Sequence, residues 1–329
     1  MMKFKQPEIT NNAEGQPRTV GLELEFAGVE IDRAADIITT LYGGKVDKEN
    51  RYEIEITDTE LGDFRVELDA RLLKKMADKS DISLEGQSVR KSIEEAVEKL
   101  AKTVVPFEIV MPPVAVEKLD RLEALREALQ KNRAEGTKSS LVHAFGMHIN
   151  IESPDLETVT LLKYLRAFLI IYPWLIEKLN IDISRRITPF VFPFAEKYVR
   201  KVLNPSYQPD EDQFIKDYVD FNPTRNRPLD MMPIFGMLNE RLIQPVMEGE
   251  KNNERPTFHY RLPNSKIEDP DWRFEDEWDY WLVVEKLADD DVMLEKLCRL
   301  YLLRERETII SFHKEWAKTV TILLNLDEQ

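Results

Sequence analysis

Gly21-Leu22-Glu23-Leu24-Glu25-Phe26 is the stretch on which the predicted fold depends. As a β-strand it places Leu22, Leu24 and Phe26 on one face and the two glutamates on the other, because successive side chains alternate. The apolar face can pack against a core. The glutamates repel each other unless a cation lies between them or one keeps its proton. A hard divalent cation such as Mg²⁺ would relieve this repulsion, and an amphipathic strand with both glutamates in water is the alternative.

The composition is that of a globular protein of one large domain or two small ones. The 329 residues are 43% hydrophobic and 33% charged, with 61 acidic against 46 basic side chains and a net charge of −15. An acidic chain disfavours non-specific binding to nucleic acid or to an anionic membrane. We therefore expect no nucleic-acid partner and no membrane partner.

The location expected from the sequence is the cytoplasm. Cys298 is the single cysteine, so an internal disulfide is excluded and a reducing compartment fits. The first twenty residues are polar and show no secretory signal. The most apolar window, residues 161–176, is interrupted by Lys163 and Arg166.

Strands and helices are mixed along the chain, and the strands have short hairpin connections. This pattern predicts an α+β fold with a mainly antiparallel sheet packed by helices. Residues 1–17 are predicted to be a flexible leader and residues 18–329 a single domain with C-terminal helices at about 274–324. Strands are expected at 18–29, 52–57, 64–68, 107–110, 141–152 and 256–263, helices at 31–42, 89–104, 116–132, 155–179, 194–202, 211–221, 274–287 and 292–324, and irregular chain at 222–256.

Further candidate site residues lie on two of the expected strands. Glu108 lies between Phe107 and Ile109, so it points away from the face that they bury, and an acid in an apolar strand is costly unless it is paired or metal-bound. His148 and Asn150 alternate in the same way after Gly146. A solvent-facing glutamate and a structural histidine are the alternatives.

Arginines supply a second kind of candidate. Arg185 and Arg186 precede Pro189, and Arg261 is in phase with His259 near the end of a strand. Guanidinium groups bind phosphate or carboxylate oxygens in a bidentate manner. For Arg185-Arg186, a cation pair at a helix C-terminus is the alternative. The familiar glycine-rich phosphate loops and the Gly-x-Ser-x-Gly nucleophile turn are absent from the sequence.

Taken in order, these motifs resemble the "putative amidoligase" family of ATP-dependent carboxylate–amine ligases, which have the glutamine synthetase fold. The similar stretches are Gly21 to Phe26 for Gly-x-Glu-x-Glu-Phe, Asp69 with Leu72 for the aspartate motif, Phe107 to Pro112 for Val-Glu-Leu-Val-Ser-Pro, Gly146 to Asn150 for Gly-x-His-Val-His, Ser184-Arg185-Arg186 for Ser-Arg-Arg, Leu238-Asn239 for Leu-Asn, and Thr257 to Leu262 for Thr-x-Glu-Phe-Arg-Leu.

The resemblance implies a glutamine synthetase-like fold whose antiparallel sheet forms a funnel. It implies Mg²⁺ or Mn²⁺ bound by Glu23, Glu25, Glu108 and His148. Hard oxygen ligands suit these ions better than Zn²⁺. It also implies catalytic roles for Arg185, Arg186, Arg261 and Asp69, and ATP-cofactor contacts from Arg185, Arg186, Asn239 and His259.

Two departures from the family pattern concern the metal site. His259 stands where the family has a glutamate, and Asn150 stands where it has a second histidine. Both changes put a second metal ion in question. Arg65 and Glu67, near the predicted acid cluster, could form a salt bridge instead of contributing to it.

The expected function is an ATP-dependent ligase that joins a small-molecule carboxylate, with a glutamate-like γ-carboxyl as a candidate, to an amine through an acyl phosphate. The alternatives are a metal-dependent hydrolase that uses the same acids and a catalytically degenerate binding protein of the same fold. The long C-terminal helices could pack against a partner, so an oligomer is compatible with the sequence.

Overall fold

The computed structural model describes residues 4–50, 52–68, 107–136, 145–181, 191–247, 254–307 and 312–326. Over these ranges the chain is a mixed α+β fold in which every strand pair is antiparallel. The expected class is confirmed, whereas the glutamine synthetase-like fold and the funnel remain predictions. The strands are β1 (Thr19–Phe26), β2 (Lys45–Asn50), β3 (Glu53–Thr57), β4 (Phe64–Leu68), β5 (Phe107–Val110), β6 (Val114–Ala115), β7 (Met147–Glu152), β8 (Leu229–Asp230) and β9 (Thr257–Tyr260).

Strand β1 lies in the middle of the sheet. The strand order is β2-β3-β4-β5-β1-β7-β9-β8, and β6 also pairs with β1. The two long neighbours of β1 therefore come from distant parts of the sequence, β5 on one side and β7 on the other. Residues that face one another across these pairs share a face of the sheet.

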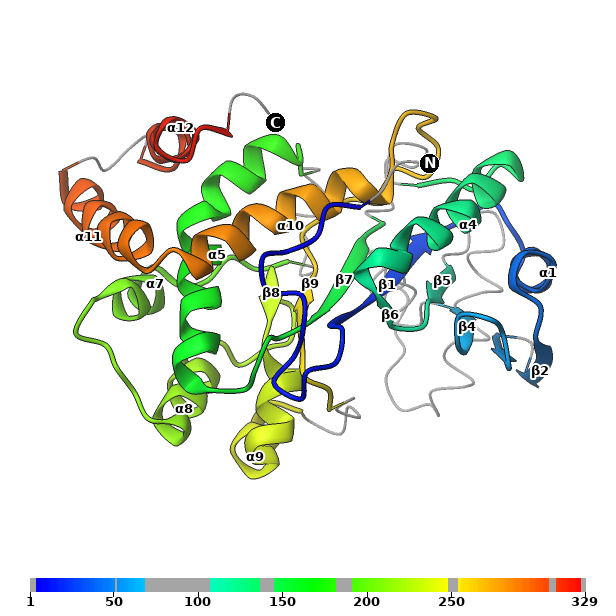
Figure 1. Ribbon diagram of the computed structural model, residues 1–329, viewed down its shortest axis with the longest axis horizontal. Helices are drawn as coiled ribbons and strands as arrows, with labels where there is room; N and C mark the ends of the chain where they lie inside the picture. The colour runs from blue at the N-terminus through cyan, green and yellow to red at the C-terminus, as the bar shows by residue number, and fades with distance from the viewer. Residues whose placement is uncertain are drawn as a thin grey trace, which may run out of the picture.

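Helices cover the apolar face. In Figure 1, α10 crosses the centre of the sheet, α5 lies on the side of β8 and β9, α1 and α4 lie toward the β2 and β4 end, α8 and α9 lie toward β8, and α11 and α12 lie beyond α5. The helices are α1 (Ile31–Tyr42), the 3₁₀ turn η1 (Val116–Lys118), α4 (Leu119–Lys131), α5 (Thr158–Lys178), α7 (Glu196–Leu203), α8 (Glu211–Phe221), α9 (Met232–Met247), α10 (Phe274–Asp289), α11 (Asp291–Glu307) and α12 (Phe312–Leu323).

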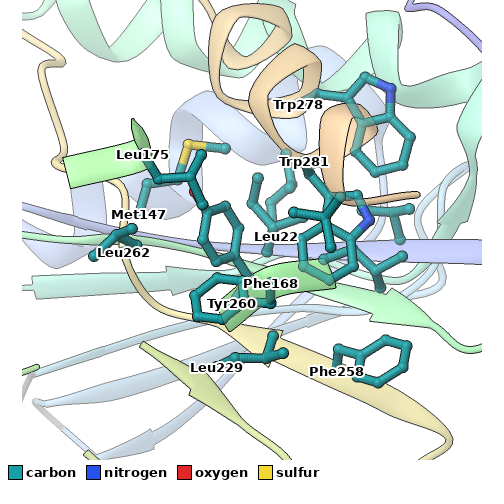
Figure 2. Packing of buried hydrophobic residues seen from close by; sticks show 14 of the residues in the cluster. Leu22, Met147, Phe168, Leu175, Leu229, Phe258, Tyr260, Leu262, Trp278 and Trp281 are labelled. Atoms are coloured by element: carbon teal, nitrogen blue, oxygen red, sulfur yellow. The ribbon is translucent and has the colours of Figure 1, made fainter. Parts of the chain in front are cut away.

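The core between the sheet and the helices is rich in aromatic rings. The Trp281 ring of α10 lies 5.4 Å from Tyr260 and 5.9 Å from Phe258, both on β9, and Phe168 of α5 lies 6.0 Å from Tyr260. Figure 2 shows these rings above the sheet together with Leu22 of β1. Each fully buried large apolar side chain contributes about 1.5–3 kcal/mol, so this contact holds β1, β7 and β9 against the helices.

Helix α5 is the central helix of this layer. Among the described residues, it is the helix long and apolar enough to cross a membrane, and 67% of its most apolar window is buried inside the protein. A helix that is apolar on nearly all sides is typical of a protein core as well as of a membrane span. Helices α10, α11 and α12 all contact it.

A buried ion pair joins the start of β1 to α10. Arg18 donates two hydrogen bonds to the Glu285 carboxylate, at 3.0 and 2.8 Å, and these two residues are 2% and 5% exposed. Tyr164 of α5 and Trp281 donate to the same carboxylate, at 2.5 and 2.8 Å. Arg18 also donates to the carbonyl oxygen of Glu152 at the end of β7. One ionic cluster therefore ties two central strands to two covering helices.

Residues 4–17, which belong to the leader predicted for residues 1–17, contact the rest of the chain. Phe4 is buried, the carbonyl oxygen of Lys5 accepts a hydrogen bond of 2.8 Å from the Trp278 indole, and the carbonyl oxygen of Ile9 accepts one of 2.8 Å from Arg18. The polar composition of this segment concealed these backbone contacts, because they use carbonyl groups that every residue has.

Most expected elements occur close to their predicted bounds, and three regions differ. The irregular stretch expected at 222–256 contains α9, which bends at Asn239 and includes Pro233 and Pro245. Strand β2 was not predicted, because its six residues are all exposed and show no alternation. The helix expected at 292–324 is divided into α11 and α12. The helix expected at 89–104 lies outside the described residues.

Replacing Glu285 by alanine should lower the free energy of unfolding by about 3–5 kcal/mol, because it leaves the Arg18 charge buried without its partner. Urea denaturation followed by circular dichroism measures this change. Glu295→Ala is the matched control, since it breaks an exposed pair with Arg299 on α11 and should change stability by less than about 1 kcal/mol. Equal losses in the two variants would contradict the role given to the buried pair.

Candidate metal centre

The pairing of β1 with β5 and β7 brings four predicted metal-binding side chains together. Glu25 lies directly opposite Glu108 of β5, and Glu23 lies directly opposite His148 of β7. All four residues are on the face opposite the aromatic core. Their neighbours along the strands, such as Leu22, Leu24 and Ile109, are buried in that core, and side chains alternate between the two faces. The convergence expected from the sequence is therefore present in the structure.

Two overlapping groups of side chains could each hold a metal ion. One consists of Glu25, Glu108 and His148, and the other of Glu23, His148 and His259, with one ligand atom of each residue within 4.8 Å of the others in its group. In the first group, His148 Nε2 lies 3.7 Å from Glu25 Oε1, and His148 Nδ1 lies 3.8 Å from Glu108 Oε1. Two ligands of one ion with bonds of 2.0–2.2 Å are about 3–3.6 Å apart, so a small movement would let one cation bind both His148 Nε2 and the Glu25 carboxylate, with Glu108 completing the group.

The carboxylate of Glu23 is surrounded by nitrogen donors. Its Oε2 atom lies 2.9 Å from His148 Nδ1 and 3.5 Å from His259 Nε2. Its Oε1 atom accepts hydrogen bonds from the Asn150 amide at 2.9 Å and from the Arg255 guanidinium at 3.2 Å. Glu23 is 9% exposed, so these contacts replace most of its hydration.

Opposite effects set the ionisation of Glu23 and His259. Burial by itself raises the pKa of the Glu23 carboxyl, but its interaction with His259 and the hydrogen bond from His148 outweigh burial and hold that pKa well below its usual range. Burial and the positive charge of Arg261 lower the pKa of His259 well below its usual value, and Glu23 only partly offsets them. At neutral pH Glu23 is therefore ionised and His259 is a neutral imidazole.

The acidic surface continues beyond the metal-binding group. Glu67 of β4 lies opposite Glu108, and Glu53 of β3 lies opposite Glu67, so a row of carboxylates crosses four neighbouring strands through Glu25. Like charges directly opposite one another destabilise a sheet. The Arg65 guanidinium lies 3.1 Å from Glu67, which confirms the predicted salt bridge and partly neutralises the row.

On the other side of β7, the polar surface continues across β9 and β8. Asn150 lies opposite His259, and His259 lies opposite Asp230. Arg261 reaches both sides of this row, with a guanidinium nitrogen 3.3 Å from His259 Nδ1 and 3.7 Å from Asp230. The predicted residues His259 and Arg261 are therefore next to the metal-binding groups.

The remaining predicted site residues are placed less directly. Asn239 lies at the bend of α9, and its amide donates a hydrogen bond of 3.1 Å to Asp212 of α8, a contact that does not connect it to the metal-binding groups. Asp69, Arg185 and Arg186 lie outside the described residues. Their roles rest on the sequence alone.

Two residues of this surface were missed by sequence reasoning. Arg255 contacts both Glu23 and Asn150, and Asp230 is fully buried between Arg225 and Arg261. Both lie in the stretch expected to be irregular, where no periodicity indicates which way a side chain points. The one available signal is that a single residue, Pro256, separates Arg255 from β9, the strand of His259.

The donor set fits a hard divalent cation. Carboxylate oxygens with one imidazole suit Mg²⁺ or Mn²⁺, because these ions prefer oxygen ligands and bind through few protein groups. His148 Nδ1 contacts Glu23 Oε2 at 2.9 Å, and such a carboxylate commonly orients a metal-binding histidine through its other ring nitrogen. The group Glu25, Glu108 and His148 is therefore the better candidate for a cation.

The structure thus defines a candidate metal centre on the polar face of an antiparallel sheet. The chain belongs to the amidoligase family, since the family profile described as "Putative amidoligase enzyme" matches residues 16–283. This agrees with the resemblance carried by the ordered motifs and indicates an amide-forming ligase. No curated protein and no solved structure matches the chain.

Mg²⁺ at about a hundred times its dissociation constant should raise the free energy of unfolding by about 2.7 kcal/mol, because it binds only the folded chain. Glu108→Gln should abolish this gain, since it removes an anionic ligand. Thermal melts in Mg²⁺ and in EDTA measure it. Glu117→Gln, an exposed glutamate of η1, should keep the full gain, and an equal gain in the Glu108 variant would rule out that ligand.

Proposed function

We propose that this protein is an ATP- and Mg²⁺-dependent carboxylate–amine ligase. The observation that supports it is the meeting of Glu25, Glu108 and His148 from three adjacent strands in a chain of the amidoligase family. Membership of the family supports amide formation, and the oxygen-rich donor set supports a cation of the kind that accompanies nucleotide phosphates.

The proposed reaction has two steps. A carboxylate oxygen of the acid substrate attacks the γ-phosphorus of ATP, the bond to the bridging oxygen breaks, and ADP leaves. The amine nitrogen then attacks the acyl carbon, the bond to the phosphate oxygen breaks, and phosphate leaves as the nitrogen loses a proton. A cation held by Glu25, Glu108 and His148 would reduce the negative charge on the phosphate groups.

Residues of this chain would act by binding and orienting. Glu25, Glu108 and His148 would hold Mg²⁺ or Mn²⁺. Arg261 lies beside His259 at the edge of this group and would neutralise charge on the transferred phosphoryl group. The same role for Arg185 and Arg186, the catalytic role of Asp69 and the ATP contacts of Asn239 and His259 are proposed from the resemblance alone.

The wider assignment follows the same reasoning. We propose a glutamine synthetase-like sheet that forms a funnel, with residues 18–329 as one catalytic domain. The substrates would be a small carboxylate, with a glutamate-like γ-carboxyl as the first candidate, and a small amine. The cytoplasm is the proposed location, because ATP is abundant there and the single cysteine suits a reducing compartment.

The decisive test is phosphate release from ATP, screened across pairs of amino acids, polyamines and small peptides. The ligase proposal requires phosphate release that depends on both a carboxylate and an amine, with an amide product detected by mass spectrometry. Hydrolysis of a substrate without ATP would favour the metal-dependent hydrolase. A nucleotide that neither binds nor turns over would favour a catalytically degenerate protein.

Glu25→Gln should abolish Mg²⁺-dependent ATP consumption, a loss of at least about a hundredfold, because an anionic ligand of the cation is removed. The fold should persist, as measured by circular dichroism. Glu49→Gln on the exposed strand β2 is the matched control and should retain full turnover. Undiminished turnover in Glu25→Gln would refute the ligand role.

Arg186→Ala should weaken the use of ATP far more than the binding of Mg²⁺, because a guanidinium that faces phosphate has no part in holding the cation. Steady-state kinetics in ATP and Mg²⁺ calorimetry on the same sample separate the two effects. Equal losses would identify Arg186 as a structural residue. Lys178→Ala, at the end of α5, is the control and should change neither.

A further inference from the structure

The two candidate metal-binding groups share His148 but differ in their other members. The group of Glu25 and Glu108 is dominated by carboxylates from facing strands. The group of Glu23 and His259 contains one carboxylate, and cationic or amide nitrogens contact it from several directions. Whether a second cation can bind therefore depends on whether the Glu23 carboxylate still has lone pairs that are not occupied by these contacts.

Internal nitrogen atoms occupy most of the hydrogen-bonding positions of Glu23. An ionised carboxylate has about four lone-pair sites. Nitrogen atoms of Asn150, Arg255, His148 and His259 lie 2.9, 3.2, 2.9 and 3.5 Å from its two oxygens. A metal ion that binds Glu23 would have to displace some of these nitrogens. Two of them belong to His148 and His259, the imidazoles that would have to bind the same ion.

The ring proton of His259 lies on the nitrogen that a metal ion beside Glu23 would need. An Arg261 guanidinium nitrogen lies 3.3 Å from His259 Nδ1, and a guanidinium can only donate hydrogen bonds. His259 Nδ1 therefore accepts from Arg261, and the ring proton lies on Nε2, the atom that faces Glu23. The ring nitrogen that a metal would need is therefore occupied by hydrogen.

Arg255 supplies the positive charge that Glu23 needs. One guanidinium nitrogen lies 2.7 Å from Asn150 Oδ1 and 3.2 Å from Glu23 Oε1, and Arg255 Nε lies 3.1 Å from Thr257 Oγ1. The Asn150 amide fits between the two charged groups, because its nitrogen donates to Glu23 while its oxygen accepts from Arg255. A guanidinium stays charged at every accessible pH, so this compensation is permanent.

We infer that Arg255 is the resident counter-cation of Glu23 and takes the place of a second metal ion, so that the site binds one divalent cation through Glu25, Glu108 and His148. Asn150 and His259, the two departures from the family pattern, then both place a nitrogen against Glu23, and the Asn150 amide donates a hydrogen bond to it. Glu23 becomes a positioning residue that orients His148. This inference concerns the number of metal ions and stands independently of the ligase chemistry.

The test is the number of Mn²⁺ ions bound per chain, counted by electron paramagnetic resonance during titration of the metal-free, full-length protein without nucleotide. Physiological salt screens exposed carboxylates. The wild-type protein should bind one Mn²⁺. The variant that combines Arg255→Met with His259→Glu loses the resident cation, gains a carboxylate ligand and should bind two.

The positive charge at position 255, rather than the shape of the side chain, should determine how many Mn²⁺ ions bind. Arg255→Lys combined with His259→Glu keeps a cation beside Glu23 and should bind one Mn²⁺. The matched control combines Arg299→Met with His313→Glu, both at exposed helix positions, and should also bind one. Two ions in the lysine variant, or one ion in the methionine variant, would overturn the inference.

The wild-type protein alone also decides the question, so the inference does not depend on whether a double variant folds. Any count other than one in the wild type contradicts it. Pulsed electron paramagnetic resonance of the bound Mn²⁺ should detect one directly coordinated imidazole nitrogen, from His148. Two coordinated nitrogens would show that His259 binds the metal. Neither measurement depends on turnover, so failure of the ligase proposal would leave the result intact.

Discussion

The register of β1 between β5 and β7 is the constraint on which the rest of the structure depends. A slip of one residue would move Leu22 and Leu24 to the polar face and the two glutamates into the aromatic core, because side chains alternate along a strand. The pairing that buries the apolar side chains against α5 and α10 is the same pairing that sets Glu25 opposite Glu108 and Glu23 opposite His148. The energy of the core thus holds together carboxylates that would otherwise separate.

Charge compensation on the polar face changes along the sheet. Toward β3 the row of glutamates is relieved by Arg65, toward β8 the buried Asp230 is held by Arg225 and Arg261, and between them Glu23 is surrounded by nitrogen donors. Paired buried charges are tolerated, whereas uncompensated ones are expensive. The carboxylates of Glu25 and Glu108 lie between these regions, and together with His148 they are the candidate ligands of an added cation.

Alternation made the central part of the site predictable, because Glu23, Glu25, Glu108 and His148 all lie on strands whose apolar neighbours show which face is buried. The same rule says nothing about Asp230, at the end of the two-residue strand β8, or about Arg255, which lies just before β9. Helix α9 was missed for a related reason, since its prolines and its bend at Asn239 interrupt the helical period. Pairing across the sheet joins segments more than a hundred residues apart, and nothing local in the sequence encodes which strands become neighbours.

The buried cluster around Arg18 bears on how short the chain could be made. The family match ends at residue 283, and Glu285 lies just past that boundary. A truncation there would remove the counter-ion of Arg18 together with α11 and α12, both of which contact α5. The buried guanidinium of Arg18 would then lack its counter-ion. The smallest piece suitable for expression is consequently longer than the segment that the family profile matches, because the contacts of α10, α11 and α12 with α5 would otherwise be lost.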